Sequence, residues 1–334
     1  MTHLVVGLSA ALHLKWLDPG RFAHAGPRLR EDPNDRLFAT DHTPDISMLC
    51  KRIRRHGFDI KAIIVFVDCF SLLQFRPHKF PKNIPVLAVI GDTHHGKRPI
   101  TDLAAWLRSE QISKVALKQT VHHGHIFRRL GFATTLLPYY LHDQIFIEPS
   151  QNKVRRVLFC GSVSSRHKKR NEVIKLIKDS GVPLDVITTH RIMSFRLYNR
   201  YIATINVPLN MDINYRFHEV VASGGCLITE RPCAESDDAI LLERDIDYIT
   251  FSSPDKAIEK IQEVLDNPKM AHAVAIRGQR KLENAHKGGV LLDSLARGLV
   301  DDSCEIISEL EWNERLSEAA RLESDQLLTQ DSWR

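Results

Sequence analysis

The sequence predicts an α/β protein made of two Rossmann-like domains, and three observations lead to this class. Apolar segments typical of buried strands alternate along the chain with segments typical of helices. The 334 residues exceed what one small core holds, which favours about two domains. A polar, basic stretch at residues 151–156 separates two such alternating series.

The first series extends from the N-terminus to about residue 137. The strands expected in it are residues 4–8, 62–67, 86–90, 114–117 and 134–137. The helices expected in it are residues 45–56, 101–110 and 122–130.

The second series begins directly after the basic stretch. Its expected strands are residues 157–160, 184–188, 202–207, 226–229 and 248–251. Its expected helices are residues 169–180, 194–201, 217–223, 255–266 and 268–286, and Ser253-Pro254 supplies the N-cap and first-turn proline of the fourth. We therefore expect an N-terminal domain at 1–152, a second domain at 153–300 and a helical tail at 301–334.

Charge is distributed unevenly along a chain of ordinary globular composition. Hydrophobic residues make up 43% and charged residues 26%, with a formal net charge of +5. Residues 301–334 hold ten acidic and three basic residues, which leaves the rest of the chain at +12. A basic body suits an anionic ligand, but it has no clustered aromatic and basic platform, so nucleic acid is not an expected partner. The acidic tail either packs on the basic N-terminal half, docks a partner or stays partly disordered.

The cysteines and apolar runs predict a cytoplasmic location. The six cysteines are scattered without CxxC or metal-finger spacing, as expected for reduced, mostly buried thiols. No apolar run approaches the roughly 20 residues that a membrane helix needs. Residues 4–12 resemble the apolar core of a signal peptide, but no basic residue precedes them, and a first strand is the better interpretation.

Residues 206–230 are the segment that most clearly predicts a ligand. A turn containing Asn214 precedes a short apolar helix, and this turn can place backbone amides near a ligand. Arg216 can contact a diphosphate with its forked guanidinium. Glu219 lies on the same helical face and can accept hydrogen bonds from two ribose hydroxyls. Taken alone, the same Arg-x-x-Glu spacing is typical of a capping carboxylate and a surface cation.

A second loop with suitable chemistry follows the strand expected at residues 157–160. It carries Gly161, Ser162, Arg166 and Arg170 at the start of a helix. Backbone N–H groups at a helix start favour phosphate, and the cations add to this preference. The alternative is a polar loop that leads into a solvated basic helix end.

The second half resembles a known enzyme group. The pattern N-x-R-F-x-E-x-x-A-x-G-G-x-L-I-T-E at residues 214–230 is similar to the donor-binding segment of the spore-maturation-protein-like (CgeB-like) glycosyltransferases. The group's usual Phe-Glu pair is here separated by His218. The resemblance extends over roughly residues 157–299. It implies the GT-B fold, in which two Rossmann-like domains face each other across a cleft. It also implies that Arg216 contacts the diphosphate and Glu219 the ribose of a nucleotide-sugar.

The N-terminal half offers candidates for acid–base chemistry. Asp92 and His94 follow the strand expected at 86–90, and His122, His123 and His125 follow another strand. In the transferase interpretation, Asp92 or His94 deprotonates an acceptor hydroxyl or stabilises charge near the anomeric carbon. In a metal interpretation, the same groups hold a metal that activates water, although no diagnostic ligand spacing is present.

These observations predict a metal-independent glycosyltransferase, of the hexosyl or a related class. It would move a sugar from a nucleotide-diphosphate-sugar to an unidentified acceptor hydroxyl of a glycan, protein, lipid or small molecule. No cofactor is expected, because the nucleotide-sugar is a substrate. Two alternatives stay open: a nucleotide-sugar epimerase or metal-dependent hydrolase that uses the histidines, and a non-catalytic module that binds a nucleotide or sugar.

Overall fold

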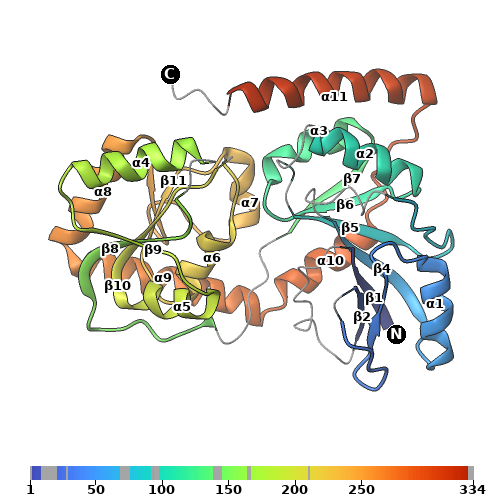
Figure 1. Ribbon diagram of the computed structural model, residues 1–334, viewed down its shortest axis with the longest axis horizontal. Coiled ribbons are helices and arrows are strands. Elements are labelled where there is room, and N and C mark those ends of the chain that lie inside the picture. The colour runs from blue at the N-terminus through green and yellow to red at the C-terminus, as the bar shows by residue number, and fades with distance from the viewer. Residues whose placement is uncertain are drawn as a thin grey trace. The chain divides into compact units, whose positions relative to one another are not determined.

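The computed structural model describes residues 2–8, 21–27, 29–67, 76–91, 93, 98–137, 145–163, 167–209 and 211–329. By its contacts the chain divides into two compact units (Figure 1). Unit 1 contains Met1–Leu137 and Leu292–Arg334, and unit 2 contains Pro138–Leu291. Residues 145–150 belong to unit 2, where the Asn199 side chain donates to the carbonyl oxygen of Glu148 at 2.8 Å.

Unit 1 contains a parallel sheet with the strand order β3-β2-β1-β4-β5-β6-β7. Its strands are β1 (Thr2–Gly7), β2 (Phe22–Gly26), β3 (Leu37–Ala39), β4 (Ile60–Val67), β5 (Val86–Ile90), β6 (Lys114–Leu117) and β7 (Ala133–Leu136). Its helices are α1 (Ile46–Arg55), α2 (Pro99–Ser109), α3 (Gly124–Arg129), α11 (Glu309–Thr329) and most of α10 (Val290–Val300), with a 3-10 turn at Val121–His123.

The unit 1 strands and helices that the sequence predicts are confirmed, but β2 and β3 were not predicted. The sequence of β2, FAHAG, has no alternation and no β-branched residue, so strand propensity does not predict it. Its residues are all buried, and parallel pairing with β1 holds them in the sheet.

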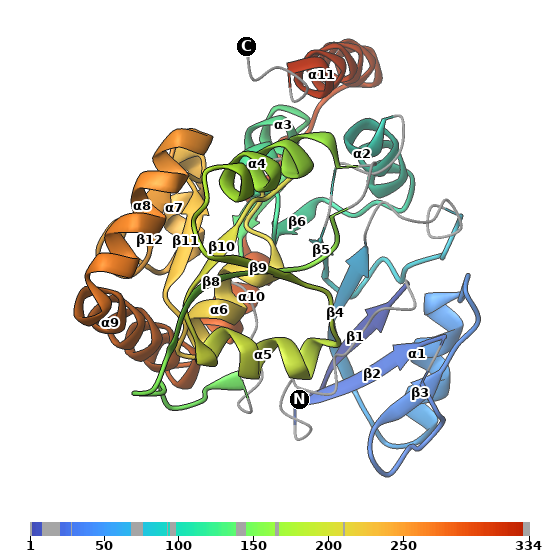
Figure 2. The ribbon, with the colours of Figure 1, turned by 60° about the vertical axis from the view of Figure 1, so that its left-hand side comes forward.

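Unit 2 contains a parallel sheet with the order β12-β11-β10-β8-β9. Its strands are β8 (Val154–Cys160), β9 (Leu184–Ile187), β10 (Tyr201–Asn206), β11 (Leu227–Glu230) and β12 (Ile249–Phe251). Its helices are α4 (Lys168–Asp179), α5 (Arg191–Arg200), α6 (Tyr215–Ala222), α7 (Asp237–Ile240), α8 (Pro254–Asp266) and α9 (Pro268–Lys287), with a 3-10 turn at Ala234–Ser236. Helix α4 packs against α8, and α6 packs against α5 and α9 (Figure 2).

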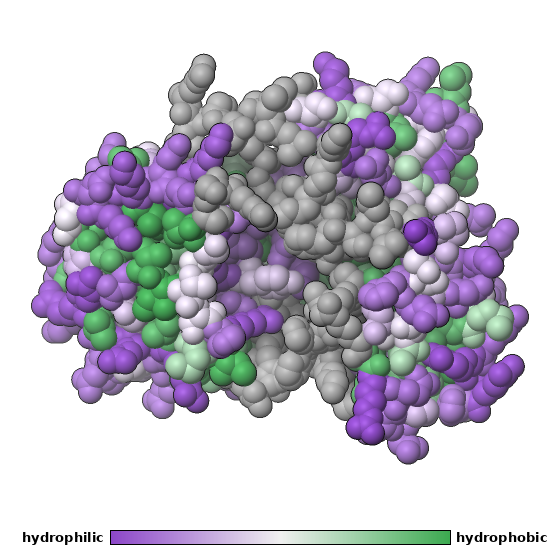
Figure 3. Space-filling view, viewed as in Figure 1, coloured by the Kyte–Doolittle hydropathy of each residue, from purple (hydrophilic) through white to green (hydrophobic). Residues whose placement is uncertain are grey.

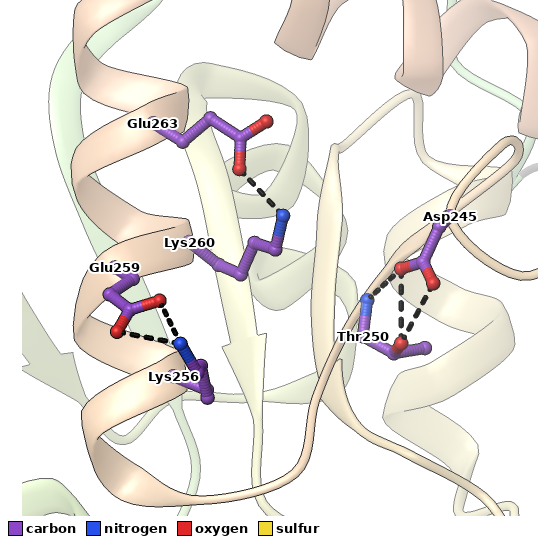
Figure 4. Close-up of polar contacts among 6 residues, drawn as sticks. All are labelled: Asp245, Thr250, Lys256, Glu259, Lys260 and Glu263. Carbon is purple, nitrogen blue, oxygen red and sulfur yellow. Dashed lines mark hydrogen bonds and ion pairs between the residues drawn. The ribbon is translucent and has the colours of Figure 1, made fainter.

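Local capping fixes the end of the unit 2 sheet at β12. Asp245 has a left-handed backbone and accepts hydrogen bonds from the backbone N–H and hydroxyl of Thr250, which position the start of β12 (Figure 4). The predicted N-cap Ser253 accepts from the N–H of Lys256 at 3.3 Å and begins α8. The close-up also shows ion pairs one turn apart on α8, including Lys256–Glu259.

Polar side chains cover most of the visible surface of each unit, and an apolar area lies on the side of unit 2 where β8 and β9 are found (Figure 3). The five cysteines that the structure describes are free thiols, as expected: Cys50, Cys160 and Cys226 are buried and Cys233 and Cys304 partly exposed. Each helix in the described parts of the chain is too short or too polar to cross a membrane.

Within the acidic stretch, residues Glu309–Thr329 form α11, which packs on α2 within unit 1. Glu323 is buried, and its carboxylate accepts hydrogen bonds from the first-turn N–H groups of Ile100 and Thr101 at 2.7 and 3.2 Å. The guanidinium of Arg108 lies 4.4 Å from the ring centroid of Trp312, on the same helix as Glu323. One carboxylate of the tail therefore caps α2.

Candidate functional site

The strand order of unit 2 changes direction between β8 and β10. The connection that leaves β8 leads to β9 on one side, whereas the connection that leaves β10 leads to β11 on the other. The loops that follow these two strands therefore diverge and leave a crevice at the carboxyl edge of the sheet. In parallel sheets this topological switch point is the usual ligand site.

The guanidinium of Arg216 lies at this switch point. Its Nε donates to the carbonyl oxygen of Cys160 at 2.7 Å, and its Nη1 donates to Asn206 Oδ1 at 2.9 Å. Its Cζ lies 4.8 Å from the centroid of the Phe159 ring. Nη2 lies against Gly161, which has φ +154°, and a Cβ there would overlap it. Arg216 is thus held in place, and among the described residues Nη2 donates to no acceptor.

Asn214 and Asn206 support this arginine. Asn214 caps α6 by accepting from the N–H of Phe217 at 3.3 Å, and its Nδ2 donates to Asn206 Oδ1 at 3.1 Å. Asn206 in turn donates to the hydroxyl of Thr229 at 3.1 Å. Asn206 was not among the predicted site residues; the signal available for it was a polar residue at the end of an apolar strand.

Glu219 lies one turn further along α6. Its side chain is only 7% exposed, and its Oε1 accepts from Arg191 Nε at 2.7 Å. Arg191 opens α5 and lies over the Tyr215 ring at 5.5 Å. Tyr198 is buried close by, and burial raises the pKa of its hydroxyl while the charge of Arg216 opposes that shift. The structure thus places Arg216 and Glu219 on one helix, as predicted, and adds Arg191 and Tyr215.

Arg170 forms hydrogen bonds with both the loop that follows β8 and the loop that follows β10. Its Nε donates to the carbonyl oxygen of Val207 at 3.0 Å, and its Nη1 donates to that of Ser162 at 3.4 Å. Burial and, to a smaller extent, the charge of Arg216 lower the pKa of Arg170 to about 10, and the charge of Asp212 opposes the shift. The guanidinium of Arg170 thus donates to a carbonyl oxygen in each of the two loops. Arg166 lies outside the described residues.

Lys169 and Glu230 form an ion pair that was not predicted. Their Nζ and Oε1 atoms are 2.7 Å apart, and Glu230 ends β11 with 9% of its side chain exposed. Burial raises the pKa of this carboxyl above its usual value, and the nearby Lys169 ammonium opposes part of that shift. The ion pair connects the first turn of α4 to the end of β11, at the carboxyl edge of the sheet.

The predicted acid–base pair of unit 1, Asp92 and His94, lies outside the described residues. Thr93 between them is described and buried. Its hydroxyl lies 2.6 Å from both the Thr120 hydroxyl and His123 Nδ1. The carboxyl ends of β5 and β6 therefore carry a buried polar cluster.

Of the three histidines that follow β6, two are buried and one is exposed. His122 and His123 are both buried, with ring centroids 4.1 Å apart. His125 is exposed, and its Nδ1 bonds the carbonyl oxygen of His122 at 2.8 Å. Within the described ranges, no group of three or more His, Cys, Asp or Glu side chains could hold a metal ion.

Part of this chain matches a known protein family. Residues 152–294 match the glycosyl transferase-like family, and this stretch contains the whole switch-point site of unit 2. No curated protein sequence is similar enough to count as a relative.

Solved structures similar to this chain share its architecture at low sequence identity. HepE (Alr3699) from Anabaena, solved in complex with UDP, has TM-score 0.62 and 10% identity, covering 90% of this chain and 99% of HepE. Sucrose-phosphate synthase from Thermosynechococcus elongatus has TM-score 0.60 and 10% identity, with coverages of 90% and 99%. TarM from S. aureus has TM-score 0.53 and 10% identity over 72% of this chain. This chain spans 55% of TarM.

The two units with their parallel sheets therefore have the GT-B fold, as predicted. The cleft that the resemblance implies between the domains stays a prediction.

Proposed function

We propose that this protein is a glycosyltransferase that takes a sugar from a nucleotide-diphosphate-sugar and transfers it to an acceptor hydroxyl. The observation that carries the proposal is the fixed guanidinium of Arg216 at the switch point, inside the stretch that matches the glycosyl transferase-like family. The GT-B fold supports it, because the same architecture occurs in nucleotide-sugar enzymes.

Arg216 would neutralise the diphosphate as it leaves the sugar. Sugar transfer places negative charge on the departing diphosphate, and a preorganised cation stabilises that charge without reorganisation. The first turn of α4 adds to this, because the backbone N–H groups at a helix start favour an anion. Glu219 would accept hydrogen bonds from the ribose, and Asn214 and Arg170 would position the two loops.

We further propose a uridine nucleotide as the first donor to test, since HepE is solved with UDP. A hexosyl sugar, independence from metal ions and a cytoplasmic location are part of the same proposal, as is membership in the spore-maturation-protein-like group. Cations and helix starts serve at this site the electrostatic purpose that a metal serves elsewhere.

On the acceptor side, Asp92 or His94 would remove the proton of the attacking hydroxyl. This role is supported by their position around Thr93, which the hydrogen bonds to Thr120 and His123 anchor at the carboxyl end of β5.

A thermal-shift panel of nucleoside diphosphates and nucleotide-sugars tests the donor class, because a ligand that binds only the folded protein raises its melting temperature. The expected hits are nucleoside diphosphates, and Glu219→Ala should lose most of the shift while its own melting temperature stays near that of the unaltered protein. Donor hydrolysis or transfer, with and without a chelator, then separates enzyme from binding module. Binding without turnover across an acceptor panel would favour the module, and an unchanged titration of the Glu219 variant would contradict the assignment.

A further inference from the structure

Two planar side chains lie exposed beside the buried carboxylate of Glu219. Tyr215 is 46% exposed, the side chain of Arg191 is 51% exposed, and the guanidinium of Arg191 lies 5.5 Å from the Tyr215 ring centroid. The same guanidinium lies 5.9 Å from the ring of Phe195. Large aromatic side chains are usually more deeply buried than this.

The local structure fixes where these two groups lie. Tyr215 is the first residue of α6, directly after its cap Asn214, and Arg191 is the first residue of α5, directly after the loop that leaves β9. Both helices start at the carboxyl edge of the sheet. The ion pair with Glu219 holds the Arg191 guanidinium at 2.7 Å.

The position beside Glu219 determines what such a surface can bind. A nucleobase is joined directly to its ribose, so a flat platform next to the ribose carboxylate lies within reach of the base. Bases stack on aromatic rings and on guanidinium planes, because every base has a flat π-face. That stacking depends on planarity alone.

We propose that Tyr215 and Arg191 form the nucleobase subsite and that it takes a base with carbonyl acceptors, namely uracil, thymine, cytosine or guanine. This inference rests on the proposed function of the same site. Arginine only donates hydrogen bonds, so it favours the carbonyl oxygens of these bases over the amino group of adenine. Tyr215 supplies the stacking surface.

The test uses the full chain and isothermal titration with UDP, GDP, ADP and pyrophosphate. Tyr215→Ala should weaken the binding of each nucleoside diphosphate about tenfold or more and leave pyrophosphate binding unchanged, because only the stacking partner is lost. Tyr215→Phe should keep nearly full affinity. Leu176→Ala, which removes another exposed apolar side chain on α4, is the matched control and should change nothing.

Base preference is the second readout. The unaltered protein should bind UDP or GDP more tightly than ADP, and Arg191→Met should reduce that ratio. Equal affinity of Tyr215→Ala and the unaltered protein for UDP would overturn the subsite alone, and so would an equal loss of pyrophosphate binding. If the unaltered protein binds none of the nucleotides, the proposed function fails together with the subsite.

Discussion

Arg216 acts as one part of a fixed set of residues. Two of its nitrogens are bound to the ends of β8 and β10, and its third nitrogen lies against Gly161. Lysine would offer one charge without this fork, so the geometry explains why an arginine stands here. The glycine at 161 is the other half of the arrangement, because its missing Cβ leaves room for the guanidinium.

Gly161→Ala should therefore displace Arg216. We expect nucleoside diphosphate affinity to fall about tenfold or more, as expected when a charged hydrogen-bonding group is lost. Titration calorimetry measures this. Gly181→Ala is the control, since Gly181 also has a positive φ of +82° but open space around it. Equal affinities for the two variants would contradict the displacement.

The contribution of Lys153 to the stability of unit 2 depends on pH in the alkaline range. Its ammonium donates to the carbonyl oxygens of Asn199 and Gly224, and burial lowers its pKa from 10.5 to about 8. Between these values the unfolded chain binds a proton that the folded chain does not. The contribution of Lys153 to stability therefore rises as pH rises through this window.

The difference in unfolding free energy between the unaltered protein and Lys153→Met should consequently shift in favour of the unaltered protein from about pH 7.5 to about pH 10. Urea unfolding at both pH values measures it. Lys175→Met, at an exposed position on α4, should show no such shift. A pH-independent difference for Lys153→Met would show that its pKa is ordinary.

At the scale of elements, helices and strands with strong local sequence signals were predicted well. The N-cap Ser253 and the proline that follows it gave a correct helix start, because capping depends on residues close in sequence. Strand β2 was missed because its place in the sheet comes from pairing with β1 and β3, which no local pattern reveals.

In the site, too, residues close in sequence were predicted and residues from distant elements were not. Arg216, Glu219 and Asn214 lie within one short segment, and their grouping on α6 follows from helical spacing. The partners Asn206, Arg191 and Glu230 come from other elements, and only the strand order brings them to the switch point. Asp92, His94 and Arg166 stay predictions.

Helix α11 is attached to unit 1 through a buried carboxylate. Glu323 accepts hydrogen bonds from the start of α2, and Glu323→Ala should lower the unfolding free energy by about 1–2 kcal/mol through loss of this cap. Protease should also cleave the helix faster. Glu314→Ala, at an exposed position on the same helix, is the control. Equal protease sensitivity of the two variants would contradict the capping role.

At the scale of the whole molecule, the proposed donor site belongs to unit 2 and the proposed acceptor base to unit 1. Nucleotide binding therefore depends on the residues of one unit, whereas transfer depends on both. Ligand at about a hundred times its Kd should stabilise the folded protein by about 2.7 kcal/mol. Changes at Asp92 or His94 are accordingly expected to reduce transfer and to leave donor affinity near its original value.

The most direct measurement is titration calorimetry of the full chain with UDP and GDP, comparing the unaltered protein, Arg216→Ala and Arg280→Ala. Arg280 is an exposed arginine on α9 and controls for the loss of one charge. The switch-point site predicts that the unaltered protein and Arg280→Ala bind one of the nucleotides equally, and that Arg216→Ala binds it at least about tenfold more weakly. Equal binding by all three proteins, or binding by none, would contradict it.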